Sequence, residues 1–247
     1  PDGFHHLGDL TLRATPRGQA ESLCSTVVDG QVAAAAKAKA GKLTPGATPM
    51  DWSHSVDVGL QRTAGRRGAG DCPLQVTRTL TSRRGAVEDD GTGRGEGLEL
   101  WFKVHNPSTT TEVTLGALGI SMPFDQDFVG RTLVQVAHQC SFVEPFLGMG
   151  GGYVQVTRAT GGGPVLLLLP AAGTEFEAWR PLRNGEDAMR LDFMYEMSYE
   201  LLLHSDAYAK GEWRHAQPWN APTSRVLPRA PRPNTGCVSC SHPPSSW

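Results

Sequence analysis

The chain has 247 residues, of which 39% are apolar and 19% charged, which is too apolar for a disordered chain and enough for one large all-β core or two small domains. Its 29 glycines and 18 prolines work against long helices, because inside a helix a glycine costs about 1 kcal/mol and a proline about 3 kcal/mol. The formal net charge of −2 leaves no basic surplus for a phosphate backbone, so nucleic-acid binding is not expected. No purely apolar run is longer than that of residues 165–169, which is far shorter than the roughly 20 residues of a membrane span, and no span is expected.

The first strand is predicted at residues 7–13, where Leu10 and Leu12 alternate with polar side chains at the period of two that is typical of a half-buried strand. From about residue 16 to 70 this pattern is lost, and a loosely structured insertion is expected there. An alanine-rich stretch at 33–40 is compatible with a short helix or with a solvated loop.

Regular strand signals return at residues 74–80. In the next predicted strand, residues 98–104, the apolar side chains face one side, and Glu99, Trp101 and Lys103 face the other. Further strands are predicted at 112–122, 153–158, 165–169, 191–203 and 225–227.

The strands are short and are separated by turn residues, and amphipathic helices do not alternate with them. This pattern predicts an all-β fold, a two-sheet antiparallel β-sandwich with few short helices, one of them near 132–138. Residues 186–204 combine helical and alternating spacing, and their aromatic content favours a strand. We expect one domain over residues 1–227, followed at 228–247 by an unstructured tail rich in proline, serine and cysteine.

The cysteines predict no dense disulfide framework, since there are five of them in a long chain and at least one must stay unpaired. Cys237 and Cys240 have the C-x-x-C spacing, but His242 could add only a third ligand where zinc needs four. No metal site and no cofactor are therefore expected.

Polar residues gather at Asp125, Asp127 and Arg131, with Glu144 a little further along the chain. Such carboxylates could serve as acid and base, as glycoside hydrolysis requires, with the arginine as a charge clamp. They could equally contact a ligand or a second domain, or form a turn in which the aspartates accept bonds from backbone N–H groups. No catalytic residue is assigned.

A second, aromatic group contains Trp179, Arg180, Trp213 and Trp219. Aromatic rings beside polar side chains suit a sugar, and the same residue types anchor contacts between domains or belong to a core. We expect this group and the loop at 125–131 to lie on one side of the sandwich.

Five blocks, at residues 4–13, 118–124, 140–145, 176–181 and 218–224, together resemble the domain of unknown function 5695 family. The resemblance runs from about residue 4 to 227. Members of this family are similar to six-hairpin glycosidases, in which an N-terminal, supersandwich-like β-sandwich precedes a helical (α/α)6 toroid.

The resemblance implies a function, which we state as an expectation. The chain would be the N-terminal accessory β-sandwich of a carbohydrate-active, glycoside hydrolase-like enzyme, packed against the helical domain of the parent protein and not catalytic alone. The alternative is a stand-alone carbohydrate-binding or structural module that contacts a polysaccharide or glycan. A secreted or extracellular location is also favoured by the resemblance.

Overall fold

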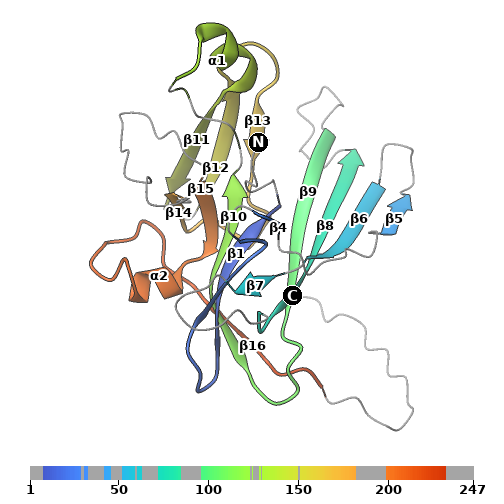
Figure 1. Cartoon of the computed structure of the whole chain (residues 1–247), viewed down its shortest axis with the longest axis vertical. Coiled ribbons are helices and arrows are strands. Elements are labelled where there is room, and N and C mark those ends of the chain that lie inside the picture. The colour runs from blue at the N-terminus through green and yellow to red at the C-terminus, as the bar shows by residue number, and fades with distance from the viewer. Residues whose placement is uncertain are drawn as a thin grey trace.

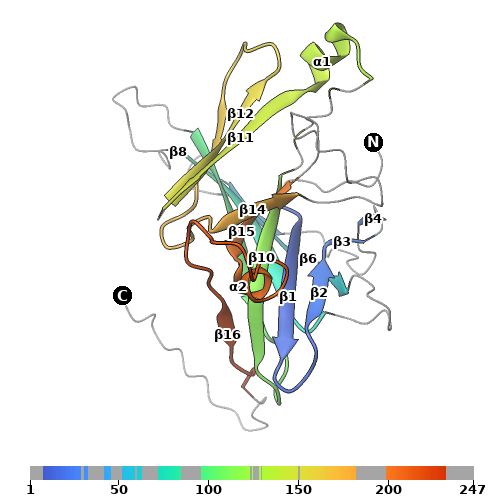
Figure 2. The same ribbon diagram turned by 90° about the vertical axis from the view of Figure 1, so that its left-hand side faces the viewer.

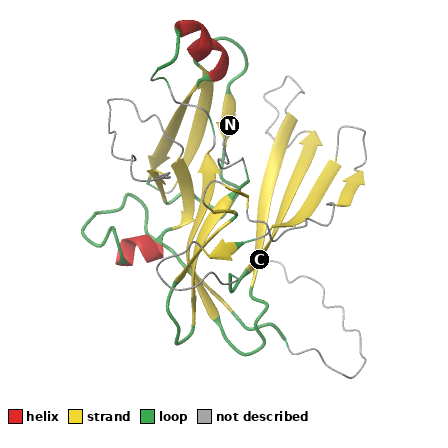
Figure 3. Cartoon of the chain, in the orientation of Figure 1, coloured by secondary structure: helices red, strands yellow, loops and turns green. Residues whose placement is uncertain are grey.

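The computed structural model describes residues 8–28, 31–32, 42–45, 52–58, 60–62, 72–84, 96–122, 124, 128, 130–149, 151–181 and 199–231. In these ranges the chain forms antiparallel sheets and two short helices, which confirms the predicted all-β sandwich (Figures 1 and 3). No helix in this part of the chain has the length and apolar character needed to cross a membrane.

The largest sheet, here called the central sheet, has seven strands in the order β14-β15-β10-β1-β2-β7, with β16 also paired to β10. All of its pairings are antiparallel. Its strands are β1 (Leu10–Pro16), β2 (Ser22–Ser25), β7 (Gln61–Arg62), β10 (Val113–Met122), β14 (Ala178–Pro181), β15 (Tyr199–His204) and β16 (Arg225–Leu227).

Three smaller sheets complete the described structure. A four-stranded sheet has the order β5-β6-β8-β9, a three-stranded sheet the order β11-β12-β13, and β3 pairs with β4. The bounds are β3 (Val27–Val28), β4 (Gln31–Val32), β5 (Lys42–Pro45), β6 (Trp52–Val58), β8 (Gln75–Arg84), β9 (Glu96–His105), β11 (Ser141–Gly148), β12 (Gly151–Arg158) and β13 (Leu166–Leu168).

The four-stranded and three-stranded sheets both pack on the same face of the central sheet. Leu10 and Leu12 of β1 form one core cluster with Val76 of the four-stranded sheet. Met122 of β10 forms a second cluster with Val154 of the three-stranded sheet. Alternate residues of β10 and their partners in β1 face this side, so one apolar face serves both layers (Figure 1).

The other face of the central sheet is covered by the second helix, α2 (Asp206–Lys210). Figure 2 shows α2 in front of β10, with β6 and β8 behind the sheet. Ala117 and Leu202 pack here against Tyr208 of α2, and Trp213 packs on the same cluster. The middle of the central sheet, where Ala117 and Leu202 lie, is thus buried on both faces.

Most of the predicted elements are confirmed. The predicted helix near 132–138 is α1 (Leu133–Gln139), and strands lie where they were predicted at 7–13, 74–80, 98–104, 112–122, 153–158, 165–169 and 225–227. The sequence reading did not predict β11, β14 or α2, nor the strands β2 to β7 between residues 16 and 70. The possible helix at 33–40, residues 191–198 of the predicted strand at 191–203, and the tail from 232 onward lie outside the described residues.

A disulfide joins the central sheet to the four-stranded sheet. Cys24 of β2 pairs with Cys72, just before β8, across 48 positions of sequence and a Cα–Cα distance of 5.9 Å. Cys24 is fully buried in the first core cluster and Cys72 packs against that cluster. Cys140 is buried and is not part of a disulfide.

Candidate functional site

The predicted contact residues do not all lie in one place. Asp125 and Asp127 are outside the described residues. Arg131 and Glu144 belong to the segment containing α1 and β11, whereas Arg180 follows Trp179 in β14 on the central sheet. The other two, Trp213 and Trp219, follow α2.

The outer face of the three-stranded sheet carries aromatic side chains instead of the polar ones that a solvated face normally shows. Phe142 and Phe146 lie on this face of β11, with Glu144 between them. Tyr153 is directly opposite Phe146, and their stacked rings have centroids 4.8 Å apart. Gln155 is opposite Glu144. The Glu144 carboxylate and the Gln155 amide therefore lie among exposed aromatic rings on this face.

Helix α1 extends this surface at one end of the sheet (Figure 1). Thr132 caps its N-terminus. The Thr132 hydroxyl accepts a hydrogen bond from the Gln135 backbone N–H, and the Thr132 backbone N–H donates to the Gln135 side-chain oxygen. The helix buries none of its residues, and Leu133 and Val134 are 87% and 68% exposed. Local capping rather than packing therefore holds this short helix. We call the apolar face the surface formed by Leu133, Val134, Phe142, Phe146, Tyr153 and Leu167.

The start of α1 is tied to the three-stranded sheet by two contacts. The Arg131 guanidinium donates to the Cys140 sulfur at 3.0 Å, and Cys140 is buried. Phe128 stacks on Phe142, with ring centroids 5.4 Å apart. Two of the predicted contact residues are thus near the apolar face: Glu144 lies between its phenylalanines, and Arg131 lies at the start of α1.

Arg180 lies on the face of the central sheet covered by α2, next to a carboxylate that was not predicted. Glu200 of β15 is completely buried and accepts hydrogen bonds from the Thr11 hydroxyl and the Arg180 guanidinium. Gly119 of β10 leaves the space that the carboxylate occupies, since a Cβ there would collide with the Glu200 side chain. Glu200 is therefore a fully bonded interior ion.

Tyr208 of α2 lies beneath two guanidinium groups. The Arg13 and Arg180 guanidinium carbons are 3.9 Å and 4.8 Å from its ring centroid, and Trp213 stacks on it at 4.9 Å. Burial and the charge of Glu200 raise the pKa of Tyr208 to about 12, against the opposing effect of the two arginines. The ring therefore stays protonated, and this cluster holds α2 on the sheet.

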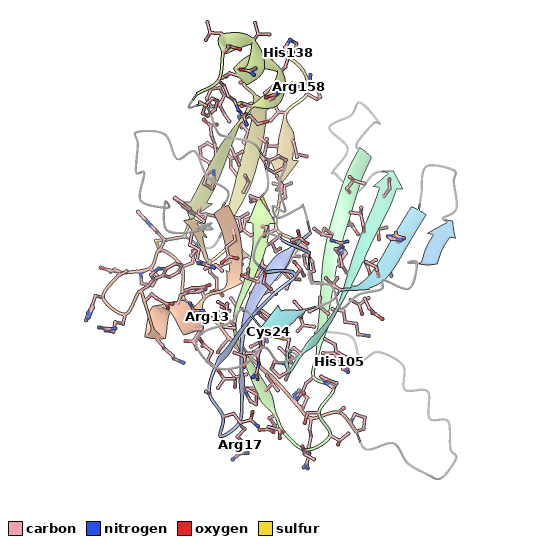
Figure 4. All side chains as sticks on the ribbon, viewed as in Figure 1. Arg13, Arg17, Cys24, His105, His138 and Arg158 are labelled. Atoms are coloured by element: carbon pink, nitrogen blue, oxygen red, sulfur yellow. A yellow bond between two sulfur atoms is a disulfide. The ribbon has the colours of Figure 1, made fainter. Side chains whose placement is uncertain are left out.

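Arg13 is balanced by Glu212 at the surface. The guanidinium donates to both carboxylate oxygens of Glu212, and these hydrogen bonds lower the pKa of that carboxyl. Figure 4 shows Arg13 on the side of the molecule where α2 lies. Arg180 and Trp213, two of the predicted contact residues, both contact Tyr208 in this cluster.

Glu177 is a second buried carboxylate that sequence reasoning missed. It accepts bonds from the Ser205 hydroxyl at 2.6 Å and from the Thr223 backbone N–H at 3.1 Å, and Thr223 also donates its hydroxyl. His204 Nδ1 lies 3.9 Å from the carboxylate. Burial acts to raise the pKa of Glu177, but the nearby His204 and the hydrogen bonds from Ser205 and Thr223 outweigh it and hold the pKa below its usual value.

Trp179 and Trp219 are separated from these clusters. Trp179 precedes Arg180 in β14 and pairs with Leu201, so its side chain is on the opposite face of the strand from that of Arg180. It is 42% exposed, and Trp219 is 76% exposed. The neighbouring Asn220 donates to the Phe176 carbonyl at 3.1 Å, which fixes the backbone beside Trp219.

Within the described ranges, no three histidine, cysteine, aspartate or glutamate side chains gather in a way that could hold a metal ion. The buried carboxylates of the described residues, Asp9, Glu177 and Glu200, all accept hydrogen bonds from neighbouring side chains. The side chains of the apolar face are exposed to solvent. Contiguous exposed apolar patches mark interaction surfaces, so this face is the candidate site.

The sheets and the two covered faces define an antiparallel β-sandwich protein with an exposed apolar face. The chain belongs to the family of unknown function DUF5695, whose model matches residues 1–238. No curated protein and no solved structure matches the chain.

Proposed function

We propose that the chain is the N-terminal accessory β-sandwich of a carbohydrate-active, glycoside hydrolase-like protein, and that its apolar face packs against a helical (α/α)6 domain of that protein. The observation that carries this proposal is the exposure of aromatic and aliphatic side chains on the three-stranded sheet and α1. The likeness of the family to six-hairpin glycosidases supplies the class of partner.

The chemistry of the apolar face supports contact with another protein domain. Phe142 and Phe146 are 36% and 45% exposed, so covering the remaining surface of either ring contributes about 1 kcal/mol. Glu144, near the middle of the exposed rings, offers a carboxylate for a basic side chain of the partner. The helices of a partner domain would bring apolar stripes that pack on such a sheet face.

The test uses this chain and the helical domain of the parent protein, purified separately and mixed. We expect a complex by size-exclusion chromatography with light scattering, and we expect Phe146→Ser to abolish it. Trp219→Ala is the matched control, since it removes an exposed aromatic ring elsewhere and should leave the complex intact. Unchanged association of the Phe146→Ser variant would contradict the proposal.

The alternative function, a carbohydrate-binding module that works without a catalytic domain, is supported by a different surface. The outer face of the four-stranded sheet is polar and carries one exposed tryptophan, Trp101. This arrangement suits a sugar better than a protein, because sugar rings stack on one aromatic ring while their hydroxyls bond to polar neighbours.

A further inference from the structure

We propose that the outer face of β6, β8 and β9 binds a neutral polysaccharide chain, with Trp101 as the stacking platform. The proposal rests on the proposed function only for its class of ligand, carbohydrate. It concerns a different sheet from the apolar face and can be tested separately.

The outer face consists of three parallel rows that cross the strands β6, β8 and β9. Each row takes one residue from each strand, as the register of the two ladders dictates. Successive rows are about 6.8 Å apart, because alternate residues of a strand face the same side. The rows are Ser53, Thr81 and Glu99; Ser55, Thr79 and Trp101; Asp57, Thr77 and Lys103.

Hydrogen bonds along the rows show that these side chains share one face. The hydroxyls of Ser55 and Thr79 are 2.9 Å apart, and the Thr77 hydroxyl donates to Asp57 at 2.7 Å. A hydroxyl has one donor and two acceptor positions, so each keeps bonding capacity for a ligand after these contacts. The face is thus a regular array of partners for sugar hydroxyls.

Trp101 supplies the apolar component of the array. Its side chain is 47% exposed, directly opposite Thr79, and its ring N–H donates to the Glu99 carboxylate at 3.3 Å. This bond orients the indole before any ligand arrives, which reduces the entropy lost on binding. One oriented ring among hydroxyls can stack on a pyranose ring.

The strands beneath this face pack on the core at one end. Val76 of β8 is buried in the first core cluster, and Phe102 and Val104 of β9 pack against that cluster from the inner side of the sheet. Arg78 of β8 donates to the Gly8 carbonyl at 3.2 Å, which adds a polar tie to the segment before β1. This packing helps to keep the polar partners and the ring in position.

The charges of the face select a neutral ligand. Among the side chains of the three rows, Asp57 and Glu99 are acidic and Lys103 is basic, so these rows carry no cationic surplus to attract phosphate or uronate groups. A protein partner would need several apolar anchors, as the apolar face has, whereas this face offers one ring. An uncharged glycan chain is the occupant that fits both features.

The test is affinity electrophoresis of the 247-residue chain in native gels that contain soluble starch, laminarin, galactomannan, arabinoxylan or dextran. At least one of these polysaccharides is expected to retard the chain. Trp101→Ala is expected to lower the affinity measured from this retardation at least tenfold. Thr79→Val should weaken it several-fold while leaving Trp101 in place. Circular dichroism checks that both variants keep the β-sheet spectrum.

Two control variants separate this proposal from the proposed function. Trp219→Ala removes an exposed ring elsewhere, and Phe146→Ser alters the apolar face; neither should change the retardation. Absence of retardation by all five polysaccharides would overturn the inference, as would binding of anionic polygalacturonate alone. Unaltered binding by Trp101→Ala would also overturn it, whatever the association with the helical domain shows.

Discussion

Glu177 and Glu200 are both buried, but they are bonded in different ways. Glu200 faces Arg180, so its charge is balanced by an opposite charge on the neighbouring strand. Glu177 is bonded mainly to neutral groups, the Ser205 hydroxyl and the Thr223 hydroxyl and backbone N–H. Such donors favour the ionised form of a carboxylate. The position of the segment that contains Ser205 and Thr223 therefore depends on the ionisation of Glu177.

The first prediction concerns the dependence of stability on pH. Because the folded-state pKa of Glu177 is lowered, the folded chain binds fewer protons than the unfolded chain once the pH falls below the usual glutamate value of 4.5. The stabilisation from ionised Glu177 is thus complete above that value and decreases as the pH falls toward the folded-state pKa. Urea unfolding between pH 3 and 6 should show this decrease in the wild type.

The matched variant for this prediction is Glu177→Gln, which should be less stable than the wild type at neutral pH and should have a flatter pH dependence below 4.5. Glu212→Gln serves as the control, since the Glu212 carboxyl also has a lowered pKa but is half exposed and screened by solvent. Identical pH profiles for the wild type and Glu177→Gln would contradict the assignment.

The predicted aromatic group shows what residue identity alone leaves open. Trp179 and Arg180 are adjacent in the sequence, and the sequence reading placed them in one group. In β14 adjacent side chains point to opposite faces, so Arg180 reaches Glu200 and Trp179 does not. The partner of Arg180 is 20 positions away, and neither it nor Gly119 carries a local signal that predicts their contact.

At the level of elements, alternation predicted the long strands β1, β8, β9 and β10, which have seven to ten residues. The predicted strands at 165–169 and 225–227 are shorter and do not rest on alternation. Strand β10 pairs along most of its length with β1 and also with β15 and β16, and its apolar pattern reflects this burial. Strand β14 has only four residues and α2 only five, too few to display a period. Strand β11 was missed because its outer face carries aromatic residues, so it does not alternate between apolar and polar.

The second prediction compares two aromatic residues that belong to neighbouring elements. Trp179→Ala should lower the free energy of unfolding by less than about 1.5 kcal/mol, because the ring is partly exposed at the edge strand β14. Tyr208→Ala should cost about 3–5 kcal/mol, since it empties the space between Trp213 and the two arginines. Denaturant titrations of the two variants measure both values, and equal losses would contradict the placement of Trp179.

At the level of the whole molecule, one face of the central sheet supports two layers that extend from it in different directions (Figure 1). The all-β class could be predicted from alternation and composition. The sharing of a single face could not, because it depends on which of several similar apolar strands lie opposite one another. The same limit explains why the apolar face, which is built from β11, β12, β13 and α1, emerged only from the structure.

The third prediction is that the chain alone releases no reducing sugar from polysaccharides. The buried carboxylates that the structure describes, Asp9, Glu177 and Glu200, are engaged in structural bonds, and the family resemblance implies that catalytic carboxylates belong to a helical domain. A colorimetric reducing-end assay on the purified chain measures this. Sugar release that disappears in the Asp127→Asn variant would contradict the prediction and make Asp127 a catalytic candidate.

The fourth prediction concerns the Cys24–Cys72 disulfide. Closing a loop across 48 positions of sequence should stabilise the fold by about 4 kcal/mol through the lost entropy of the unfolded chain. The double variant Cys24→Ser, Cys72→Ser should therefore unfold at a clearly lower denaturant concentration. Cys140→Ser is the control for removing a buried thiol without breaking a disulfide. A midpoint unchanged from the wild type would show that the disulfide contributes nothing.

The position of this disulfide also bears on where the protein can mature. Glutathione and thioredoxin keep cysteine pairs reduced in most cytosols, whereas export pathways oxidise them. A chain synthesised in a reducing compartment would have to hold the four-stranded sheet on the central sheet by packing alone. The yield of folded protein should therefore be higher when the chain is exported than when it is produced in the cytosol. Oxidation of one cysteine pair would thus favour one route of production over the other.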